Sequence, residues 1–506
     1  MFSAPTGHWR RRPFQRVVAT AVVVTLTFAP LPLSTAQAFA QSALPDLGDV
    51  SQADFSPAQE KKLGETIVRQ VRAAGGYMND PEVNDYLNDL GHRLVAAVPT
   101  PNPDFEFFAV PDNGINAFAL PGGYIGVNTG LILLAQSESE LAAVIGHEIS
   151  HVTQHHMARS LAKQKDSMLM SLAGLALAIL AARSGGASSG DVAGGMLAAT
   201  QALAIQHQIN YTRENEYEAD RLGFQRLDAA GFDDTAMATF MQRLQKSSQF
   251  VQGNVPTYLR DHPVTYERIA EAQSRAEGHP YRQVPDSLDF QLVRALLRSY
   301  QNEPKEAVAA FDEAIEQRKY NNEVAVHYGL VASLLRAKDY NRAKIELVTL
   351  EKMAPPHPMI DAMAGHVYLD SGDVNAAVKR FETALAKYPN KMQLVYDYPE
   401  SLFVAGRFAD SAAAAENQLI RFPSDGPLHL TAARAYAALN KQMMAHRHQG
   451  EYYAWQGNLR AAVDQFELAA KAGDGDFYQA SVVDTRLRAL RREAAEQQRT
   501  GFGRDG

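Results

Sequence analysis

The second half of the chain repeats itself at a spacing of 34 residues. Three in-phase copies carry corresponding residues at four positions: Asp339, Ala343, Leu347 and Pro355; Asp373, Ala377, Phe381 and Pro389; and, more loosely, Arg407, Ser411, Ala415 and Pro423. A copy of this length holds two helices and a turn, and such a helical pair cannot bury its apolar face alone. The copies must stack on one another, which predicts a solenoid of helical pairs.

The repeat resembles the tetratricopeptide repeat. Two further stretches fit its second helix, namely Ala307, Phe311 and Ala314, and Ala462, Phe466 and Ala469. The alanines let paired helices approach, the phenylalanines fill the gap between them, and the proline closes each copy. A generic helical bundle is the alternative, which the three in-phase copies disfavour. We expect an all-α tetratricopeptide-repeat domain at 286–496 and a polar tail at 497–506.

A His-Glu-Ile-Ser-His motif occupies residues 147–151, inside a run whose apolar residues recur at helical spacing. Two histidines four residues apart lie on one helix face, so His147 and His151 can bind one metal ion together. Glu148 then lies beside the metal, where a carboxylate can take a proton from a metal-bound water and pass it to the leaving amine. The motif predicts a zinc-dependent metalloendopeptidase with one Zn²⁺ per chain; zinc is inferred from the ligand types.

The surroundings of the motif favour a helix. Ser137 and Glu140 form an S-x-x-E capping box just ahead of the run at 141–164, which we expect to be helical. His155 repeats the four-residue spacing after His151. We interpret His155 and His156 as a polar helix face rather than as metal ligands.

A third ligand is needed, because catalytic zinc keeps three protein ligands and an open position. A second expected helix, at 215–231, has Glu216 four residues before Asp220. Glu216 could bind the metal while Asp220 hydrogen-bonds a ligand imidazole from behind or takes part in the proton transfers. Spacing alone does not choose Glu216 over Glu214 or Glu218, and carboxylates on a helix are most often solvated.

Four sequence blocks are similar, in order and spacing, to the HtpX-like family of zinc metallopeptidases. They are NAFALPGGYIGVNTGLI at 116–132, HEISH at 147–151, EYEADRLG at 216–223 and DHPVTYERIA at 261–270. The resemblance spans about residues 50–280 and implies that Glu216 is the third ligand. It also implies that the strand at Tyr124–Val127 is an edge strand that pairs with an extended peptide substrate. We expect an α+β zincin-like domain with a small sheet at about 105–128.

The His-Pro pair at His262 and Pro263 suggests a regulatory element. In repeat-bearing members of the family, the histidine at this point lies on a loop that can occupy the open position of the zinc. A fourth protein ligand would displace the catalytic water and hold the enzyme latent. The alternative is a helix that begins at a Pro-containing turn. Arg268, further along, could face the cleft and help to hold substrate.

The N-terminus has the pattern of a secretory signal peptide. Four arginines, Arg10, Arg11, Arg12 and Arg16, precede an apolar run at 17–33, and Ala38-Phe39-Ala40 supplies small residues for cleavage after Ala40. This predicts a signal peptide at 1–40, a zinc metallopeptidase domain at 41–285 and a periplasmic location. An uncleaved membrane anchor is the alternative, although Pro30 and Pro32 break the run.

A second apolar stretch, at 167–182, lies between the two metal motifs and is followed by a Gly-rich loop. It is short for a membrane span, so we favour a buried helical hairpin with residues 195–205. The alternative is a lid or a membrane-facing flap over the active site, with peripheral membrane contact through 167–205.

Charge and composition exclude two classes of protein. The formal charge of −8, which becomes more negative once the signal arginines are removed, argues against nucleic-acid binding. With 46% hydrophobic residues the chain can bury substantial cores and is not disordered. The absence of cysteine excludes a lipid-attachment cysteine and a disulfide framework.

The combination of signal peptide, peptidase centre and repeat array resembles a periplasmic branch of the family. That resemblance implies a protease with chaperone activity. Its substrates would be misassembled outer-membrane proteins, and its repeat array would contact the outer-membrane barrel assembly machinery. The rival is a non-catalytic tetratricopeptide scaffold or chaperone with a vestigial peptidase domain, which the intact set of motif residues argues against.

Overall fold

The computed structural model describes residues 56–99, 104–157, 159, 212–250, 256–280 and 282–499. The expected signal peptide at 1–40, the segment at 167–205 and the tail beyond 499 lie outside the described residues. The domain boundaries at 40, 285 and 496 stay predictions. Among the described helices, none combines the length and the apolar composition needed to cross a bilayer.

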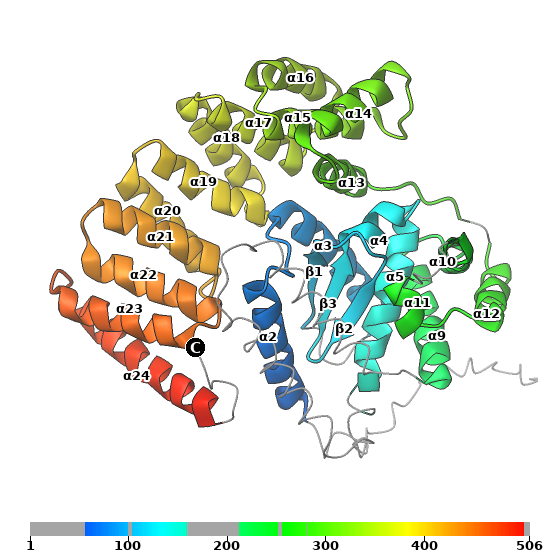
Figure 1. Ribbon diagram of the computed structural model, residues 1–506, viewed down its shortest axis with the longest axis horizontal. Helices are drawn as coiled ribbons and strands as arrows, with labels where there is room; N and C mark the ends of the chain where they lie inside the picture. Colours follow the sequence, from blue (N-terminus) through cyan, green and yellow to red (C-terminus); the bar gives the residue numbers. More distant parts are fainter. Residues whose placement is uncertain are drawn as a thin grey trace, which may run out of the picture. The chain divides into compact units, whose positions relative to one another are not determined.

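A three-stranded sheet organises the first part of the molecule (Figure 1). Its strands are β1 (Glu106–Val110), β2 (Ala117–Leu120) and β3 (Tyr124–Asn128), in the order β1-β3-β2. β1 pairs in parallel with β3, and β2 pairs with β3 in the antiparallel direction. The expectation that Tyr124–Val127 is an edge strand is therefore wrong, because β3 is the central strand.

The turn between β2 and β3 explains the correction. Gly122 and Gly123 both have a positive φ, which glycine adopts without steric cost. The tight turn after Pro121 folds β2 back against β3, and β1 then adds along the other side of β3. Glycines flank β3 because of this turn, and not because the strand lies at an edge.

Helices cover both faces of the sheet, since successive side chains of a strand point to opposite faces. α2 (Pro57–Ala73) covers the face that carries Phe108 and Phe118. α3 (Pro81–Ala97) and α5 (Glu138–Thr153) pack against the opposite face, which carries Phe107 and Ile125. The sheet is thus buried between two helical layers, with the motif helix α5 in one of them.

The two edges of the sheet differ in whether other parts of the chain hydrogen-bond to their backbone groups. Side chains from α3 close the outer edge of β1: Asn88 bonds to both the N–H and the carbonyl of Phe107, at 3.0 and 2.7 Å, and Asn84 accepts from the N–H of Ala109 at 2.9 Å. No hydrogen bond from the part of the chain that the structure describes closes the outer edge of β2. β2 packs against α5, so the open edge borders the motif helix.

The motif helix differs from its expected form at both ends. Ser137 caps it by accepting from the N–H of Glu140, but the Glu140 carboxylate accepts from the N–H of Gln136 instead of completing the capping box. At its other end α5 stops at Thr153, and His155 is left-handed with a φ of 50°. The run at 141–164 is therefore not a single helix.

The remaining helices of the first part differ in length. They are α4 (Thr129–Leu134), α9 (Arg213–Ala229), α10 (Ala236–Phe250), α11 (Thr257–Asp261) and α12 (Tyr266–Glu277). Of these helices, α9, α11 and α12 carry the later sequence blocks.

The second part consists of antiparallel helical pairs. Its helices are α13 (Leu288–Tyr300), α14 (Pro304–Glu316), α15 (Glu323–Arg336), α16 (Tyr340–Met353), α17 (Pro358–Asp370), α18 (Val374–Lys387), α19 (Met392–Val404), α20 (Phe408–Leu419), α21 (Gly426–Ala438), α22 (Gln442–Trp455), α23 (Leu459–Ala472) and α24 (Phe477–Arg499). Asp339, Asp373 and Arg407, the first residue of each sequence copy, are the N-caps of α16, α18 and α20. The sequence repeat therefore corresponds to a structural repeat.

The packing within the pairs follows the repeat. A Cβ added at Gly365 would lie 2.3 Å from the ring of Phe381, and Gly329 meets Phe311 in the same way. Each phenylalanine thus needs a glycine on a neighbouring helix: Gly365 is on the helix before Phe381, and Gly329 is on the helix after Phe311. The turns also repeat, because the left-handed residues Lys338, Gly372, Gly406 and Asn440 recur at the 34-residue spacing.

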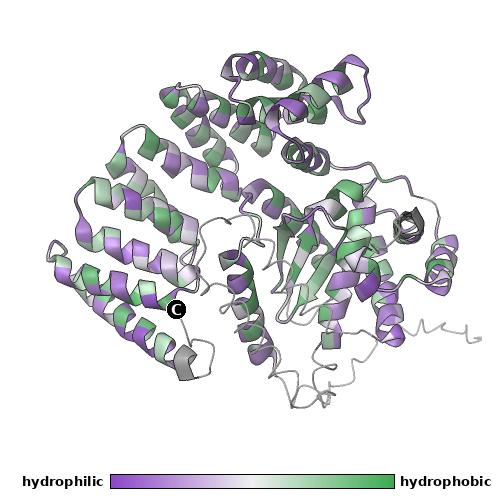
Figure 2. Ribbon diagram, in the orientation of Figure 1, coloured by the Kyte–Doolittle hydropathy of each residue, from purple (hydrophilic) through white to green (hydrophobic). Residues whose placement is uncertain are grey.

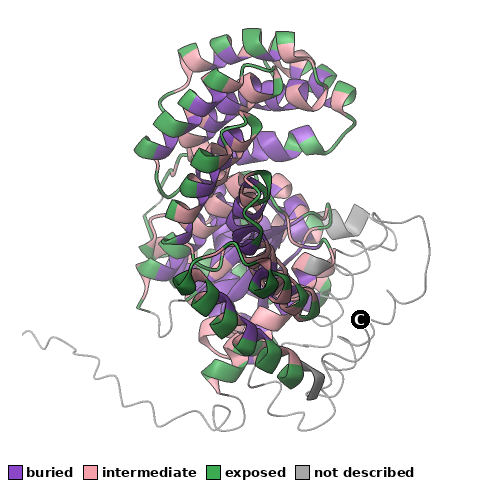
Figure 3. Ribbon diagram, turned by 90° about the vertical axis from the view of Figure 1, so that its left-hand side faces the viewer, coloured by how far each residue is buried: buried purple, intermediate pink, exposed green. Residues whose placement is uncertain are grey.

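The apolar faces of these helices point toward one another, as the alternation of hydrophobic and hydrophilic residues along each helix shows (Figure 2). Exposed residues lie on the outer surfaces of the helices, and buried residues lie between them (Figure 3). The first repeats share one apolar cluster with α3 and α5. These observations confirm the expected fold class of an α+β part followed by an all-α solenoid.

Candidate metal centre

Two glycines bring α5 and α9 close together. A Cβ on Gly223 of α9 would lie 3.0 Å from the backbone nitrogen of His147, and one on Gly146 of α5 would lie 3.3 Å from the carbonyl of Gly223. The helices cross with almost no space between their backbones. This contact places the HEISH face of α5 against the start of α9.

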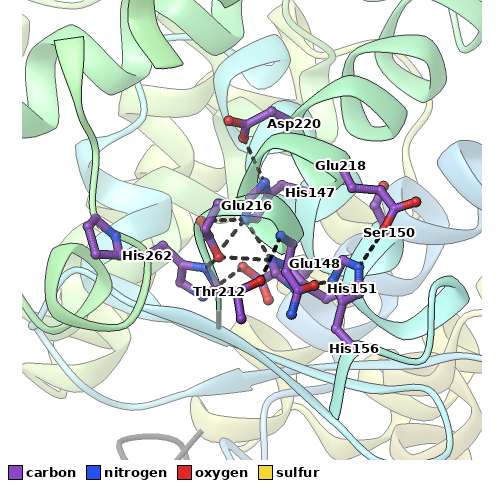
Figure 4. A network of polar contacts seen from close by, with 12 residues as sticks. His147, Glu148, Ser150, His151, His156, Thr212, Glu216, Glu218, Asp220 and His262 are labelled. Carbon is purple, nitrogen blue, oxygen red and sulfur yellow. Dashed lines mark hydrogen bonds and ion pairs between the residues drawn. The ribbon is translucent and has the colours of Figure 1, made fainter. Parts of the chain in front are cut away.

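Four buried side chains meet at this crossing (Figure 4). They are His147, His151, Glu216 and His262, and one possible ligand atom from each lies within 4.8 Å of the others. Nε2 of His147 is 2.9 Å from Nε2 of His151, and each of these nitrogens lies within 3.6 Å of a Glu216 carboxylate oxygen. The structure therefore brings together the residues that the sequence suggested as ligands.

The other nitrogen of each motif imidazole is held by a second residue. Nδ1 of His147 lies 3.0 Å from Oδ1 of Asp220, and Nδ1 of His151 lies 2.9 Å from Nδ1 of His156. With Nδ1 engaged in this way, both rings direct Nε2 to the same point. Partners of this kind fix the ring orientation and the tautomer of metal-binding histidines.

His156 is not part of a polar helix face, which corrects the sequence interpretation. It is fully buried and contacts Glu218 through Nε2 at 3.0 Å. The left-handed turn at His155 returns the chain toward α5, and this is how His156 reaches His151. The sequence signal was a His-His pair at 155–156, which three residues separate from the motif, and no helical pattern could reveal a break at that point.

The neighbours of Glu216 on α9 have different surroundings. Glu216 and Asp220 are buried, whereas Glu214 is exposed and Glu218 is directed to His156. Spacing along the chain could not tell which of these carboxylates binds the metal. The contact between α9 and α5 distinguishes them, because it buries Glu216 and leaves Glu214 exposed.

Arg268 does not face a cleft, contrary to the suggestion from the sequence. Only 2% of it is exposed, and it holds Asp220 with two hydrogen bonds of 2.6 and 2.8 Å. Its Nη1 also lies 2.7 Å from Oε2 of Glu216. Arg268 is thus a buried support for two carboxylates of the centre.

His262 lies at the C-cap of α11, and its ring reaches the cluster beside Glu216. Its Nδ1 is 3.0 Å from Oε1 of Glu216 and 3.4 Å from Nε2 of His147. Its Nε2 is 3.6 Å from Oε1 of Glu148. The ring also lies against Tyr258, with the ring centres 4.8 Å apart. His262 therefore sits between the expected ligands and the expected catalytic base.

The charges of the centre are dominated by carboxylates. Burial raises the pKa of Glu148, whose two oxygens accept no hydrogen bond from the residues that the structure describes. Burial would also raise the pKa of Glu216, but the charge on His262 and hydrogen bonds from His151 and His262 hold it well below its ordinary value. Arg268 overcomes the same effect of burial at Asp220 and lowers that pKa.

This arrangement fits a divalent cation. Glu148, Glu216 and Asp220 are all buried, and Arg268 is the fixed cation beside them. Converging imidazole nitrogens and a carboxylate oxygen are the donors that zinc takes in hydrolases. The donor chemistry and the surplus of buried negative charge therefore both suit zinc.

Comparisons with known proteins agree with the two-part architecture. Residues 81–276 match the model of peptidase family M48, and residues 362–427 match a tetratricopeptide-repeat model. The beta-barrel assembly-enhancing protease of Escherichia coli K12 is 31% identical over 474 residues, which cover 93% of this chain and 96% of that protein. Its counterpart of the same name in Yersinia pestis is 32% identical over 461 residues, 90% of this chain and 92% of the relative. The mitochondrial metalloendopeptidase OMA1 of Schizosaccharomyces pombe is 26% identical over 224 residues, 44% of this chain and 62% of that protein.

Proposed function

The chain belongs to peptidase family M48 and carries C-terminal tetratricopeptide repeats, and from this premise we propose that it is a zinc-dependent endopeptidase of the periplasm. The observation that carries the proposal is the buried cluster of His147, His151 and Glu216, with Glu148 beside it. The proposal includes secretion directed by a signal peptide at residues 1–40 that is then removed. The sequence pattern alone supports this part of the proposal.

Each residue of the centre has a chemical role in this proposal. His147, His151 and Glu216 would hold the zinc, which when bound would lower the pKa of a water so that it can lose a proton and attack a peptide carbonyl. Glu148 takes the proton of the attacking water and passes it to the leaving amine. A carboxylate whose pKa is raised by burial is suited to both steps. Asp220 and His156 orient the two imidazoles, and Arg268 holds Asp220 in place.

The open edge of the sheet supports a mode of substrate binding. β2 borders α5, and an extended peptide can add to its outer edge as a further strand. Main-chain hydrogen bonds would then place a peptide bond beside the centre with little dependence on its side chains. We assign this role to β2 and not to the central strand β3.

The clients are proposed from the relatives. Those from Escherichia coli and Yersinia pestis are named for enhancing beta-barrel assembly. We therefore propose that this chain degrades misassembled outer-membrane proteins, assists the folding of others as a chaperone, and reaches the barrel assembly machinery through its repeat array. The stacked helical pairs support the last point, because repeat arrays offer extended surfaces to partner chains.

The central experiment compares Glu148→Gln with the parent, both carrying His262→Ala so that the centre is open. We expect Glu148→Gln to retain one zinc per chain and to lose casein cleavage by about 100-fold or more, because general acid–base catalysis contributes at least that much. Zinc is measured by atomic emission and cleavage with labelled casein.

The matched control is Glu267→Gln, which makes the same change at an exposed position of α12. It should leave zinc content and cleavage unchanged. A parent and a Glu148→Gln variant that are equally inert, with zinc bound and His262 replaced, would favour the non-catalytic scaffold.

A further inference from the structure

The two motif imidazoles are held from behind by two different chains of contacts (Figure 4). Nδ1 of His147 meets the carboxylate of Asp220 directly, at 3.0 Å. Nδ1 of His151 instead meets a second imidazole, that of His156, at 2.9 Å. Nε2 of His156 in turn lies 3.0 Å from Oε2 of Glu218. His151 therefore reaches a carboxylate only through another histidine.

Glu218 fixes the direction of the outer hydrogen bond, the one between itself and His156. A carboxylate only accepts hydrogen bonds, so the proton of this contact lies on Nε2 of His156. His156 is fully buried, and burial lowers the pKa of its imidazole, so the ring is neutral and carries a single proton. Nδ1 of His156 is then unprotonated and can only accept.

The direction of the inner hydrogen bond, between His151 and His156, follows from the outer one. Since Nδ1 of His156 has no proton to donate, the proton of this contact lies on Nδ1 of His151. The other nitrogen of a neutral imidazole keeps its lone pair, and in His151 this nitrogen is Nε2. It lies 3.4 Å from Oε1 of Glu216, where the expected ligands converge. The contacts thus leave His151 in the tautomer that can bind a metal.

The fold brings these groups together from two separate helices. α9 carries Glu218, and the left-handed turn at His155 returns the chain after α5 so that His156 reaches His151. The same turn brings Nη1 of Arg159 to 3.8 Å from Oε2 of Glu218. Glu218 is therefore held between a buried imidazole and a cation.

We propose that Glu218 is a positioning residue of the metal centre, which sets the tautomer of His151 through His156 and so makes Nε2 of His151 available to the metal. This inference rests on the proposed zinc centre and deepens it. Glu218 was one of three carboxylates of α9 that spacing allowed as the third ligand. It acts instead on a ligand, from two contacts away.

The two chains of contacts end in different surroundings. Asp220 is buried and holds Arg268 in an ion pair. The side chain of Glu218 keeps 33% of its surface exposed. A change at Asp220 would leave a buried charge without its partner, which is strongly destabilising. Glu218 can be replaced at the surface without breaking a buried ion pair, so its variants should fold.

The test varies the hydrogen-bonding capacity of residue 218. Glutamate only accepts, glutamine can accept or donate, and lysine only donates. A donor at 218 requires Nε2 of His156 to accept, which moves the proton of His156 to Nδ1 and the proton of His151 to Nε2. We expect zinc affinity to fall about tenfold in Glu218→Gln and about 100-fold in Glu218→Lys, the range that loss of a ligand-orienting partner spans. Affinity is measured on the full chain by competition with a fluorescent chelator.

Glu214→Lys is the matched control for charge. It makes the same change one turn earlier on α9, at an exposed side chain, and should leave zinc affinity close to that of the parent. Nitrogen-15 NMR of the zinc-loaded parent reads the tautomers directly, which a merely structural contact would not determine. We expect the proton of His156 on Nε2 and the proton of His151 on Nδ1.

Two results would overturn the proposal. One is equal zinc affinity in the parent, Glu218→Gln and Glu218→Lys, or an equal loss of affinity in Glu214→Lys. The other is a proton on Nδ1 of His156 in the zinc-loaded chain. Failure of the proposed function has a different signature: the parent then binds zinc, the variants rank as expected, and casein is not cleaved.

Discussion

At the scale of single residues, the position of His262 makes it the candidate for a latch on the centre. Its ring is within 3.6 Å of Glu216, His147 and Glu148, so it occupies the space that an attacking water and a substrate carbonyl would need. The role of His262 as a removable fourth ligand stays a prediction. Its location is what such a latch requires, and the Pro-containing turn before α12 is compatible with it.

We predict that His262→Ala raises casein cleavage. If the latch is closed in about nine molecules of ten, removing it raises the rate about tenfold, because activity follows the fraction of competent molecules. The measurement is the initial rate with the zinc content checked in each preparation. His279→Ala, a histidine at the end of α12 and outside the centre, is the control.

Two outcomes would contradict this prediction. One is an unchanged or lower rate in His262→Ala at full zinc content. The other is an equal rise in His279→Ala, which would indicate general loosening of the domain in place of a specific latch.

At the scale of elements, the close crossing of α5 and α9 sets the geometry of the ligands. Gly223 leaves very little space for a side chain, since an added Cβ would be 3.0 Å from the backbone nitrogen of His147 and the two helices would have to shift apart. Any separation of the helices moves Glu216 away from the two imidazoles.

We predict that Gly223→Ala lowers zinc affinity about tenfold or more, because overpacking of a close contact costs about 1–3 kcal/mol. Affinity is measured by competition with a fluorescent chelator, and the melting temperature is recorded in parallel. Gly278→Ala is the matched control, since its added Cβ would have 3.5 Å to its nearest neighbour. Unchanged zinc affinity in Gly223→Ala would show that the crossing does not position the ligands.

At the scale of the whole molecule, α3 and its N-cap join the first part to the repeats through partly buried acidic residues. The Tyr328 hydroxyl donates to Glu82 at 2.7 Å, the N–H of Met392 donates to Asp85 at 2.7 Å, and Tyr300 donates to Asp80 at 3.0 Å. Burial raises the pKa of Glu82 from 4.5 to about 8 and the pKa of Asp85 from 3.8 to about 7. This interface is therefore sensitive to pH.

The sign of the pH effect follows from the raised pKa of Glu82. The folded state favours the protonated carboxyl, so its contribution to stability is complete below pH 4.5 and is lost as pH rises toward 8. We predict that Glu82→Gln raises the melting temperature at pH 8, by an amount that corresponds to at least about 1 kcal/mol, and has little effect at pH 5.

Calorimetry at the two pH values checks this prediction. The control is Glu382→Gln, which removes an exposed carboxylate of α18 and should leave the pH dependence unchanged. A Glu82→Gln variant that melts lower than the parent at pH 8 would mean that Glu82 is stabilising as a carboxylate.

Periodic patterns in the sequence predicted the repeat architecture and two of the expected metal ligands. The 34-residue spacing predicted the helical pairs, and the four-residue spacing of His147 and His151 predicted one metal-binding helix face. Each pattern relates residues on one helix or in adjacent stacked copies. The geometry of a helix and of a stacked repeat is regular, so the relative positions of these residues can be predicted from the sequence. Spacing proposed Glu216 and Asp220 but did not separate Glu216 from its neighbours. Family resemblance supplied the long-range relation that selected Glu216 and suggested the role of His262.

Only the tertiary structure decided the contacts between distant segments. The break at His155 placed His156 behind His151, the buried pairing with Asp220 turned Arg268 away from any cleft, and the hairpin at Gly122 and Gly123 put β3 in the centre of the sheet. Local patterns determine which element a residue belongs to, but burial and charge compensation depend on which elements meet in space.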